Sequence, residues 1–344
     1  MKTNVVLAGS YPAHTLEKLR LLLPEKKFNI IAADTQETFD AVTDAEIIIL
    51  RILKAPREVM ERNPKLKMIL RWGAGFDSVD IKAAGERGVL VTNTPGANAG
   101  AVSELAVLLM LAVGRKLLCH AQCLSGGQWS KTAFTDSSYT LNGKLVGILG
   151  AGNIGRQVAE KVQAFGAAVQ YYDPFPLTEE MEKKHRMARV SLKTLIATSD
   201  VISLHLPLTD ENLHMIGADE IAAMKPGAIL VNTARGGLVD DGALAEAVAG
   251  GRLLGAGLDV VESEPLSPKD PLLRDPRIVV TPHIGGGTAD IGEVILPMLV
   301  QDILDFAGGR EVQHVVNREY LSQQTPLYSI SIPAPVSAPR LRCR

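Results

Sequence analysis

The stretch "KLVGILGAGNIG", residues 144–155, decides the fold. Gly150, Gly152 and Gly155 stand in the pattern G-x-G-x-x-G directly after an uninterrupted apolar run that is typical of a buried strand. A helical pattern follows, and Gly166 is placed to end it. In this context the glycines allow a tight turn, close approach of backbone to a pyrophosphate and close packing of helix on strand. The stretch therefore predicts a dinucleotide site.

A carboxylate follows where such a site needs one. Asp173 ends the next predicted strand, "AAVQYYD". Its oxygens can accept hydrogen bonds from both ribose hydroxyls of NAD, and its charge would repel the 2′-phosphate of NADP. A chance glycine turn with a solvated aspartate is the alternative, but it leaves the flanking strand and helix unexplained. The sequence predicts NAD rather than NADP as the cofactor.

On both sides of this stretch, apolar runs alternate with helical patterns. Residues 4–94 form one such series, and the helical run ending at Gly308 is expected to return the chain to it. We therefore expect an α/β protein with two Rossmann-like doubly wound parallel-sheet domains, the first of them discontinuous. The second domain should hold six strands, at 145–149, 168–172, 200–205, 228–233, 255–260 and 278–281. The expected boundaries are 1–98 with 286–320 for a flavodoxin-like substrate-binding domain, 99–285 for the NAD-binding domain, and 321–344 for a flexible C-terminal tail.

The segment "AVSELAVLLMLAVGRKLLCHAQ", residues 101–122, is apolar nearly all round. This pattern predicts one continuous buried helix between the two lobes. Cys119 and Cys123 could be imagined as metal ligands, but zinc sites need a turn between close cysteines, and these lie within the helical pattern. We therefore expect no metal.

Composition restricts the partners and the compartment. The 36 basic and 38 acidic side chains give a net charge of -2, which offers no long-range attraction to nucleic acid or to an anionic membrane. No stretch approaches the roughly 20 uncharged apolar residues of a membrane span. The three cysteines are an odd number without paired spacing, which favours a reducing compartment. We expect a cytoplasmic protein whose partners are small molecules or proteins.

Three reactive side chains follow predicted strands of the second domain. Arg235 follows "AILVNTA", Glu262 and Glu264 follow "GAGLDVV", and His283 follows "RIVVTP". Because ligands bind outside the carboxyl ends of parallel strands, these residues are expected at one edge. Each also has an ordinary alternative as a solvated or packed loop residue. His205, in "ISLHLPLT", is a rival to His283 because it too lies near a strand end.

This set of residue types suits hydride transfer to a 2-oxo acid. A guanidinium can clamp the substrate carboxylate and polarise the keto oxygen. A protonated imidazole can deliver the proton that the developing alkoxide requires. A carboxylate beside the imidazole favours its charged form and fixes its tautomer. Together they predict a proton-transfer site with an anion clamp.

The chain resembles the NAD-dependent D-isomer-specific 2-hydroxyacid dehydrogenases, most closely the group around D-3-phosphoglycerate dehydrogenase and glyoxylate or hydroxypyruvate reductase. The resemblance runs from about residue 45 to residue 317. It is carried by "RWGAGFDSVDIKAAGERGVLVTNTPGANAGAVSELAVLLML", "VGILGAGNIGRQVA", "HLPLT", "MKPGAILVNTARGGLVDDGALAEAV", "GLDVVESEPL" and "TPHIGG".

The resemblance implies hydride transfer between nicotinamide and C2 of a small 2-oxo or 2-hydroxy acid. It implies catalytic roles for Arg235, for Glu264 rather than Glu262, and for His283, and it assigns His205 to the wall of the adenine pocket. The substrate carboxylate would be held by Arg235 and by the loop of Gly73, Ala74 and Gly75, a nest-like anion site. The implied cofactor contacts are Gly150, Gly152, Asn153, Ile154, Gly155, Asp173, Pro207, Thr233, Ala234, Arg235, Asp259, His283, Gly286 and Thr94.

The resemblance carries three further expectations. The family commonly dimerises through the nucleotide domain, so a homodimer is expected. Glu264 argues against formate as substrate, because formate dehydrogenases of this fold have glutamine there. The family also includes a corepressor that binds NAD and partner peptides, so a non-catalytic NADH-sensing protein is the alternative to an enzyme.

Overall fold

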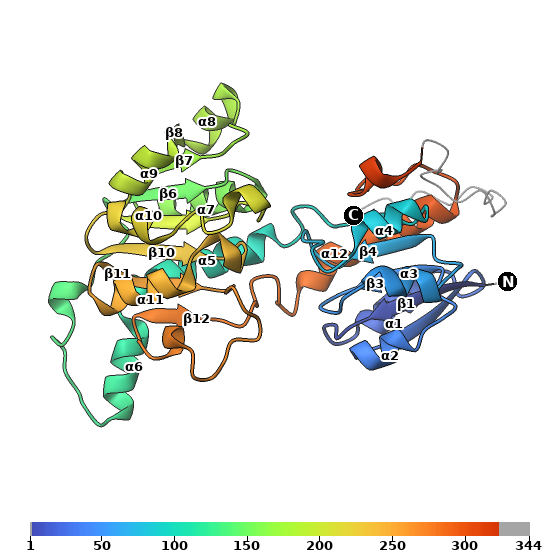
Figure 1. Cartoon of the computed structure of the whole chain (residues 1–344), viewed down its shortest axis with the longest axis horizontal. Helices are drawn as coiled ribbons and strands as arrows, with labels where there is room; N and C mark the ends of the chain where they lie inside the picture. Colours follow the sequence, from blue (N-terminus) through green and yellow to red (C-terminus); the bar gives the residue numbers. More distant parts are fainter. Residues whose placement is uncertain (1, 323–344) are drawn as a thin grey trace, which may run out of the picture. The chain divides into compact units, whose positions relative to one another are not determined.

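The computed structural model describes residues 2–322, which form two compact units (Figure 1). Unit 1 holds the chain up to Asn98 together with the segment from Thr288 onward, and unit 2 runs from Ala99 to Gly287. The chain thus returns to unit 1 two residues later than the expected start at 286. Of the predicted tail, 321–344, all but the first two residues lie outside the described chain.

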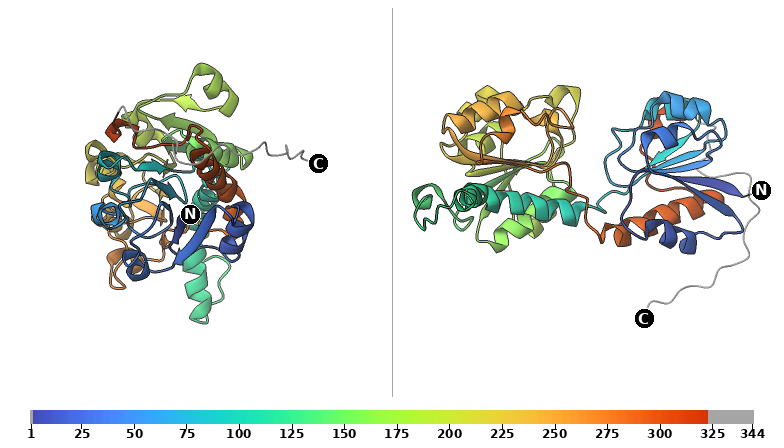
Figure 2. Two further views of the ribbon diagram at one scale, coloured as in Figure 1. Left: turned by 90° about the vertical axis from the view of Figure 1, so that its right-hand side faces the viewer. Right: turned by 90° about the horizontal axis from the view of Figure 1, so that it is seen from below.

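Unit 1 is built on a five-stranded parallel sheet with the order β2-β1-β3-β4-β5. Side chains alternate between its faces, so that Val5 and Leu7 pack with α1 and α12, while Val6 and Ala8 pack against the opposite side. Figure 2 shows α12, in orange, along one face of this sheet. The elements are β1 Thr3–Ala8, α1 Thr15–Leu22, β2 Phe28–Ala33, α2 Gln36–Asp40, β3 Ile47–Leu50, α3 Arg57–Arg62, β4 Met68–Arg71, α4 Ile81–Glu86, β5 Leu90–Thr92, α12 Ile291–Ala307 and the 3-10 turn η5 Arg318–Tyr320.

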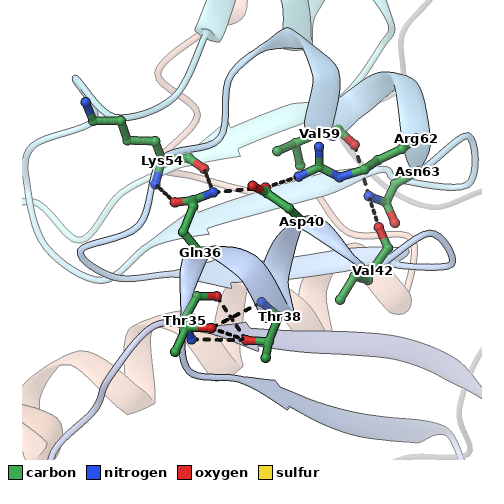
Figure 3. A network of polar contacts seen from close by, with 9 residues as sticks. All are labelled: Thr35, Gln36, Thr38, Asp40, Val42, Lys54, Val59, Arg62 and Asn63. Atoms are coloured by element: carbon green, nitrogen blue, oxygen red, sulfur yellow. Dashed lines mark hydrogen bonds and ion pairs between the residues drawn. The ribbon is translucent and has the colours of Figure 1, made fainter.

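Side-chain hydrogen bonds fasten the short helices α2 and α3 to their loops (Figure 3). The amide of Gln36 accepts from the Lys54 backbone N–H at 3.0 Å and donates to the Lys54 carbonyl at 3.2 Å. The Asp40 carboxylate accepts hydrogen bonds from the side-chain amide of Gln36 and from the guanidinium of Arg62. The bond to Arg62 joins α2 to α3. Asn63 donates to the carbonyls of Val42 and Val59, both at 3.0 Å. Helices this short gain little from propensity alone, so such tertiary bonds carry much of their order.

Unit 2 has a seven-stranded parallel sheet with the order β12-β11-β10-β9-β6-β7-β8. Helices α5 and α7 pack on one face, and α9, α10 and α11 on the other. The elements are α5 Ala99–Gly114, α6 Leu117–Ser125, η1 Thr135–Ser137, β6 Leu145–Leu149, α7 Asn153–Ala164, β7 Ala168–Tyr172, α8 Glu179–His185, β8 Ala188–Arg189, α9 Leu192–Thr198, β9 Val201–Leu204, η2 Asp210–Asn212, α10 Ala218–Ala223, β10 Ala228–Asn232, η3 Gly236–Leu238, α11 Asp241–Ala249, β11 Leu253–Leu258, η4 Pro271–Leu273 and β12 Ile278–Val280.

The predicted fold class is confirmed, since both sheets are parallel and covered on both faces. All six strands predicted for the second domain are present, with small shifts at their ends. The additional strand, β8, has two exposed residues at the edge of the sheet, so it carries no apolar run that a sequence pattern could reveal.

The prediction of one continuous helix over 101–122 is wrong. The chain leaves α5 at Gly114 and begins α6 at Leu117, with Lys116 between them in the left-handed region at φ 54°. The buried Lys116 side chain explains the break, because its ammonium donates to the Leu254 carbonyl of β11 at 2.7 Å. The apolar pattern could not reveal this tertiary bond. Within residues 2–322, no helix is long and apolar enough to span a bilayer.

A buried acid in unit 1 makes stability depend on pH. Asp302 of α12 is 3% exposed, and its Oδ1 lies 3.8 Å from the nearest basic atom, Nδ1 of His314. Burial raises the pKa of Asp302 to about 6, and the proximity of His314 offsets only part of that rise. The native state therefore binds this proton more tightly than the unfolded chain does. The contribution of Asp302 to stability is therefore fully present while the acid is protonated and is lost as the pH rises from about 4 to about 6.

Replacing Asp302 by asparagine should raise the free energy of unfolding of unit 1 by about 1–3 kcal/mol at pH 7.5, because the variant has no charge to bury. The gain should fade at pH 4.5, where the wild-type acid is protonated. Urea unfolding followed by the fluorescence of the buried Trp72 measures both values. Asp34→Asn, at an exposed position, is the control and should show no such pH dependence. An equal gain at both pH values would contradict the assignment.

Candidate active site

The glycine turn between β6 and α7 lies where the strand order of unit 2 reverses, since β6 has β9 on one side and β7 on the other. Gly150 has φ 100°, and a Cβ there would lie 2.7 Å from the backbone of His205. A Cβ on Gly155 would lie 2.0 Å from the Gly150 carbonyl oxygen. Gly152, in contrast, has nothing within 4 Å of its Cβ position. Backbone atoms of the protein therefore crowd Gly150 and Gly155, whereas the space beside Gly152 is open. This open space fits close approach of a pyrophosphate.

Arg156 orders this turn, although the sequence analysis did not single it out. Its guanidinium donates to the Ala151 carbonyl and to Oδ1 of Asn153, both at 2.8 Å. One of the two acceptor sites of the Asn153 amide oxygen is therefore occupied, and its NH₂ group has no partner within the described residues. The predicted contact Ile154 is half-buried and packs in the core beside α5.

Asp173 follows β7 and is held by two backbone donors. The Ala151 N–H donates to its Oδ2 at 2.7 Å, and the Phe175 N–H donates to its Oδ1 at 2.8 Å. Each oxygen of the carboxylate keeps a second acceptor site, which fits two ribose hydroxyls. Together with the open side of Gly152, this arrangement matches the dinucleotide NAD.

His205 is separated from His283 by its burial. Its Nε2 lies 2.9 Å from the Ser203 hydroxyl, and its Nδ1 is buried with no hydrogen-bond partner among the described residues. Burial lowers the pKa of His205 to about 3. A histidine held neutral in this way is unsuited to donating a proton near neutral pH.

His283 instead lies within hydrogen-bond distance of Glu264. Nδ1 of His283 lies 2.9 Å from Oε2 of Glu264, and the two side chains are 53% and 41% exposed. Glu262 is the other acid that the sequence left as a candidate partner, and its Oε1 lies 2.9 Å from Nε2 of His214. The structure thus brings Glu264, and not Glu262, to His283.

The turn that carries His283 is fixed by Asp259. The Asp259 carboxylate, 2% exposed, accepts from the Thr281 hydroxyl at 2.6 Å and from the N–H groups of Ile284 and Gly285, both at 2.8 Å. Its backbone carbonyl accepts from the N–H of His283, a non-glycine residue at φ 54°. Most of the acceptor capacity of Asp259 is therefore spent within the turn. Thr281 was not predicted; its only sequence signal is a hydroxyl directly after the last strand.

Arg235 follows β10 in extended backbone conformation, with φ −144°. Its carbonyl accepts from the Asn232 side chain at 2.7 Å, and its Nη1 donates to the Ala234 carbonyl at 2.7 Å. A Cβ on the next residue, Gly236, would lie 2.0 Å from the Val261 carbonyl oxygen, so this loop packs tightly on the segment after β11. Of the other predicted cofactor contacts on this unit, Thr233 is buried, Pro207 is exposed and Gly286 is half-buried.

The predicted residues of unit 1 form a small hydrogen-bonded group of their own. The N–H of Gly73 donates to the Thr94 hydroxyl and to the Arg71 carbonyl, both at 3.0 Å. Thr94 is completely buried, so it has no exposed atom that could make the predicted contact with the cofactor. Ala74 and Gly75 are half-buried. Arg71 bonds the Leu50 carbonyl at 2.9 Å and the Gly75 carbonyl at 3.0 Å.

Comparison with known proteins agrees with this arrangement. The family described as "D-isomer specific 2-hydroxyacid dehydrogenase, NAD binding domain" matches residues 107–285. A glyoxylate reductase of Korarchaeum cryptofilum is 37% identical over 332 residues, which cover 95% of this chain and 99% of that protein. Among solved structures, the TT0316 protein of Thermus thermophilus is similar with a TM-score of 0.80 and 35% identity, covering 91% of this chain and 100% of that one. The chain therefore belongs to the D-isomer specific 2-hydroxyacid dehydrogenases and is an NAD-dependent oxidoreductase.

A D-3-phosphoglycerate dehydrogenase of Archaeoglobus fulgidus is 38% identical over 283 residues, which cover 82% of this chain and 53% of that protein. The chain thus spans about half the length of this relative.

The clamp at Asp259 yields a stability test. Thr281→Val removes one donor from a buried carboxylate and should lower the free energy of unfolding of unit 2 by about 1.5–3 kcal/mol, the range for a hydrogen bond to a charged group. Thr281→Ser keeps the hydroxyl and should retain most of that stability. Urea unfolding of the three proteins, followed by circular dichroism, measures the difference. A loss in Thr281→Ser with none in Thr281→Val would show that the methyl group of Thr281, not its hydroxyl, is what matters.

Proposed function

We propose that the protein reduces a small 2-oxo acid, glyoxylate or hydroxypyruvate, with NADH, and that it forms the D-isomer when the product is chiral. The observation that carries the proposal is the 2.9 Å pair of His283 and Glu264. These residues follow β12 and β11, and β11 lies next to β10, which delivers Arg235. The similarity over nearly the full length of a glyoxylate reductase supports this substrate class. D-3-phosphoglycerate remains the second candidate, because the matching phosphoglycerate dehydrogenase is as similar over a shorter part of its length.

The geometry assigns a role to each side chain of the pair. Nδ1 of His283 is engaged by Glu264, so the proton must pass between the substrate oxygen and the other ring nitrogen, Nε2. Glu264 stabilises the charged imidazole and fixes its tautomer. The guanidinium of Arg235 holds the substrate carboxylate and polarises the keto oxygen. NADH, when bound, supplies the hydride.

We further propose that the two units divide the binding. The glycine turn and Asp173 of unit 2 bind NAD, and the backbone N–H groups after Gly73 in unit 1 bind the substrate carboxylate. The alternative, a non-catalytic NADH sensor, has no use for a histidine–glutamate pair that follows β11 and β12, and the named relatives are enzymes. Both cysteines of unit 2 are free thiols, which supports a reducing compartment such as the cytoplasm.

The test is NADH consumption with glyoxylate, hydroxypyruvate, phosphohydroxypyruvate and pyruvate, set against NADPH. We expect turnover with NADH on at least one of the first two. His283→Asn should lower kcat by about 10²–10⁴-fold, the usual contribution of a general acid, while NADH binding measured by fluorescence is retained. Glu264→Gln should lower kcat less, because its amide oxygen can still accept from Nδ1.

Glu262→Gln is the matched control, since it changes the same chemical group two residues away, at His214 rather than His283. It should keep near-normal turnover. A His283→Asn variant with wild-type kcat would overturn the catalytic assignment. Tight NADH binding without turnover on any 2-oxo acid would favour the sensor instead.

We also propose a homodimer that forms through α6 and the segment behind it. This segment extends away from the sheet of unit 2 (Figure 1), and Trp129 within it is 81% exposed. Large exposed apolar side chains in one region are typical of a protein interface. The others in this segment are Leu117, Leu118 and Leu124.

The double variant Leu124→Ser with Trp129→Ser should dissociate the dimer. Light scattering after gel filtration should give about twice the chain mass of 36.8 kDa for the wild type and a single chain mass for the variant. Leu21→Ser removes an exposed leucine from α1 of unit 1 and should remain dimeric. A wild-type monomer, or a variant that stays dimeric, would refute this interface.

A further inference from the structure

Residues 73–76, the loop after β4, have three consecutive carbonyl groups that are all engaged. The Gly73 carbonyl accepts from the Thr94 backbone N–H at 3.1 Å. The Ala74 carbonyl accepts from Nδ2 of Asn93 at 2.7 Å, and the Gly75 carbonyl accepts from Nε of Arg71 at 3.0 Å. Each of these three peptide units is therefore held by a partner from β4 or from the residues that follow β5.

A held carbonyl also fixes the direction of the next N–H group. In a planar trans peptide the C=O and the following N–H point in opposite directions. The N–H groups of Ala74, Gly75 and Phe76 must then point away from the partners that hold the carbonyls. None of these three N–H groups has a hydrogen-bond partner within the described chain. Successive unpaired N–H groups of this kind form an anion-binding concavity.

The loop geometry also revises which amides are available. Gly73 was predicted to contribute, but its N–H is already shared between the Thr94 hydroxyl and the Arg71 carbonyl. Gly73 also has a backbone conformation, φ 134°, that is unfavourable for a residue with a side chain. The donors are therefore Ala74, Gly75 and Phe76, and Gly73 serves as the hinge that sets their orientation.

We propose that Asn93 is the positioning residue of this anion site, and the proposal rests on the function proposed above. Its side chain holds the central peptide unit, so it directs the Gly75 N–H toward the substrate carboxylate. Thr94 acts on the first unit through its backbone, and Arg71 also bonds β3, so both have additional structural roles. Asn93 is itself anchored, because its backbone N–H donates to the His314 carbonyl at 3.3 Å. The amide of Asn93 supplies an N–H donor to the Ala74 carbonyl without adding a charge to the loop.

The test is Asn93→Leu, which keeps the approximate size of the side chain and removes the donor without adding charge. The KM for the 2-oxo acid and the dissociation constant of oxalate, measured with NADH present, should both rise about tenfold. The KM for NADH and kcat should each change by less than about twofold, because neither cofactor binding nor proton transfer uses this loop. The urea midpoint should stay close to the wild-type value. Asn29→Leu is the control, as it makes the same substitution at an exposed position of β2 in the same unit. It should leave all these constants unchanged.

The outcomes separate the two proposals, because oxalate binding requires no turnover. An active wild type in which Asn93→Leu leaves both the KM and the oxalate constant unchanged would overturn the role of Asn93 alone. A parallel loss of NADH affinity and of the urea midpoint would also overturn it, since it would show a structural role only. A wild type that binds oxalate but reduces no 2-oxo acid would overturn the proposed function, while a raised oxalate constant in Asn93→Leu would still support the anion site.

Discussion

The buried carboxyl group of Asp259 is the group on which the geometry of the proposed proton-transfer edge depends. A polar group at 2% exposure is costly unless it has hydrogen-bond partners, and here one hydroxyl and two N–H groups donate to it. These same bonds hold the turn of His283 at φ 54°, a conformation that is unfavourable for a residue with a side chain. Gly285 is required beside it, because a Cβ there would lie 2.9 Å from Oδ2 of Asp259. The strained turn is thus maintained by its surroundings, and it presents the imidazole to Glu264.

The parallel sheet explains how distant residues reach one place. Strands β10, β11 and β12 are neighbours in the sheet, and their carboxyl ends deliver Arg235, Glu264 and His283. Strands β10 and β11 are buried along nearly their whole length, and β12, at the edge of the sheet, is buried at Ile278. Packing therefore fixes the register of these strands and holds their ends in position. The loops beyond those ends can then carry polar groups without disturbing the core. Such an edge suits a reaction that needs a cation, a proton donor and a carboxylate together.

The sequence predicted those features that local patterns determine. Strand positions followed from short apolar runs, and the glycine turn followed from spacing that backbone crowding at Gly150 and Gly155 requires. The choice between Glu262 and Glu264, and between His205 and His283, rested on the resemblance, because position along the chain could not separate them. Burial and side-chain partners do separate them. The break at Lys116 and the parts played by Arg156, Thr281 and Asn93 depend on contacts with distant backbone atoms, which no local pattern encodes.

The two units leave backbone donors unpaired by different means. In unit 2 the N-cap of α7 is Gly152, which has no side chain to satisfy the first N–H groups of the helix. In unit 1 the first turn of α4 is capped by its own Asp80, whose carboxylate accepts from the Ala83 N–H at 2.8 Å. One donor of that helix end is therefore already satisfied. The unpaired donors of unit 1 lie earlier, at 74–76, in a loop held by Asn93, Thr94 and Arg71. A pyrophosphate suits the first arrangement because the helix dipole adds to the N–H groups. A small carboxylate suits the second, because three successive N–H groups are left unpaired there.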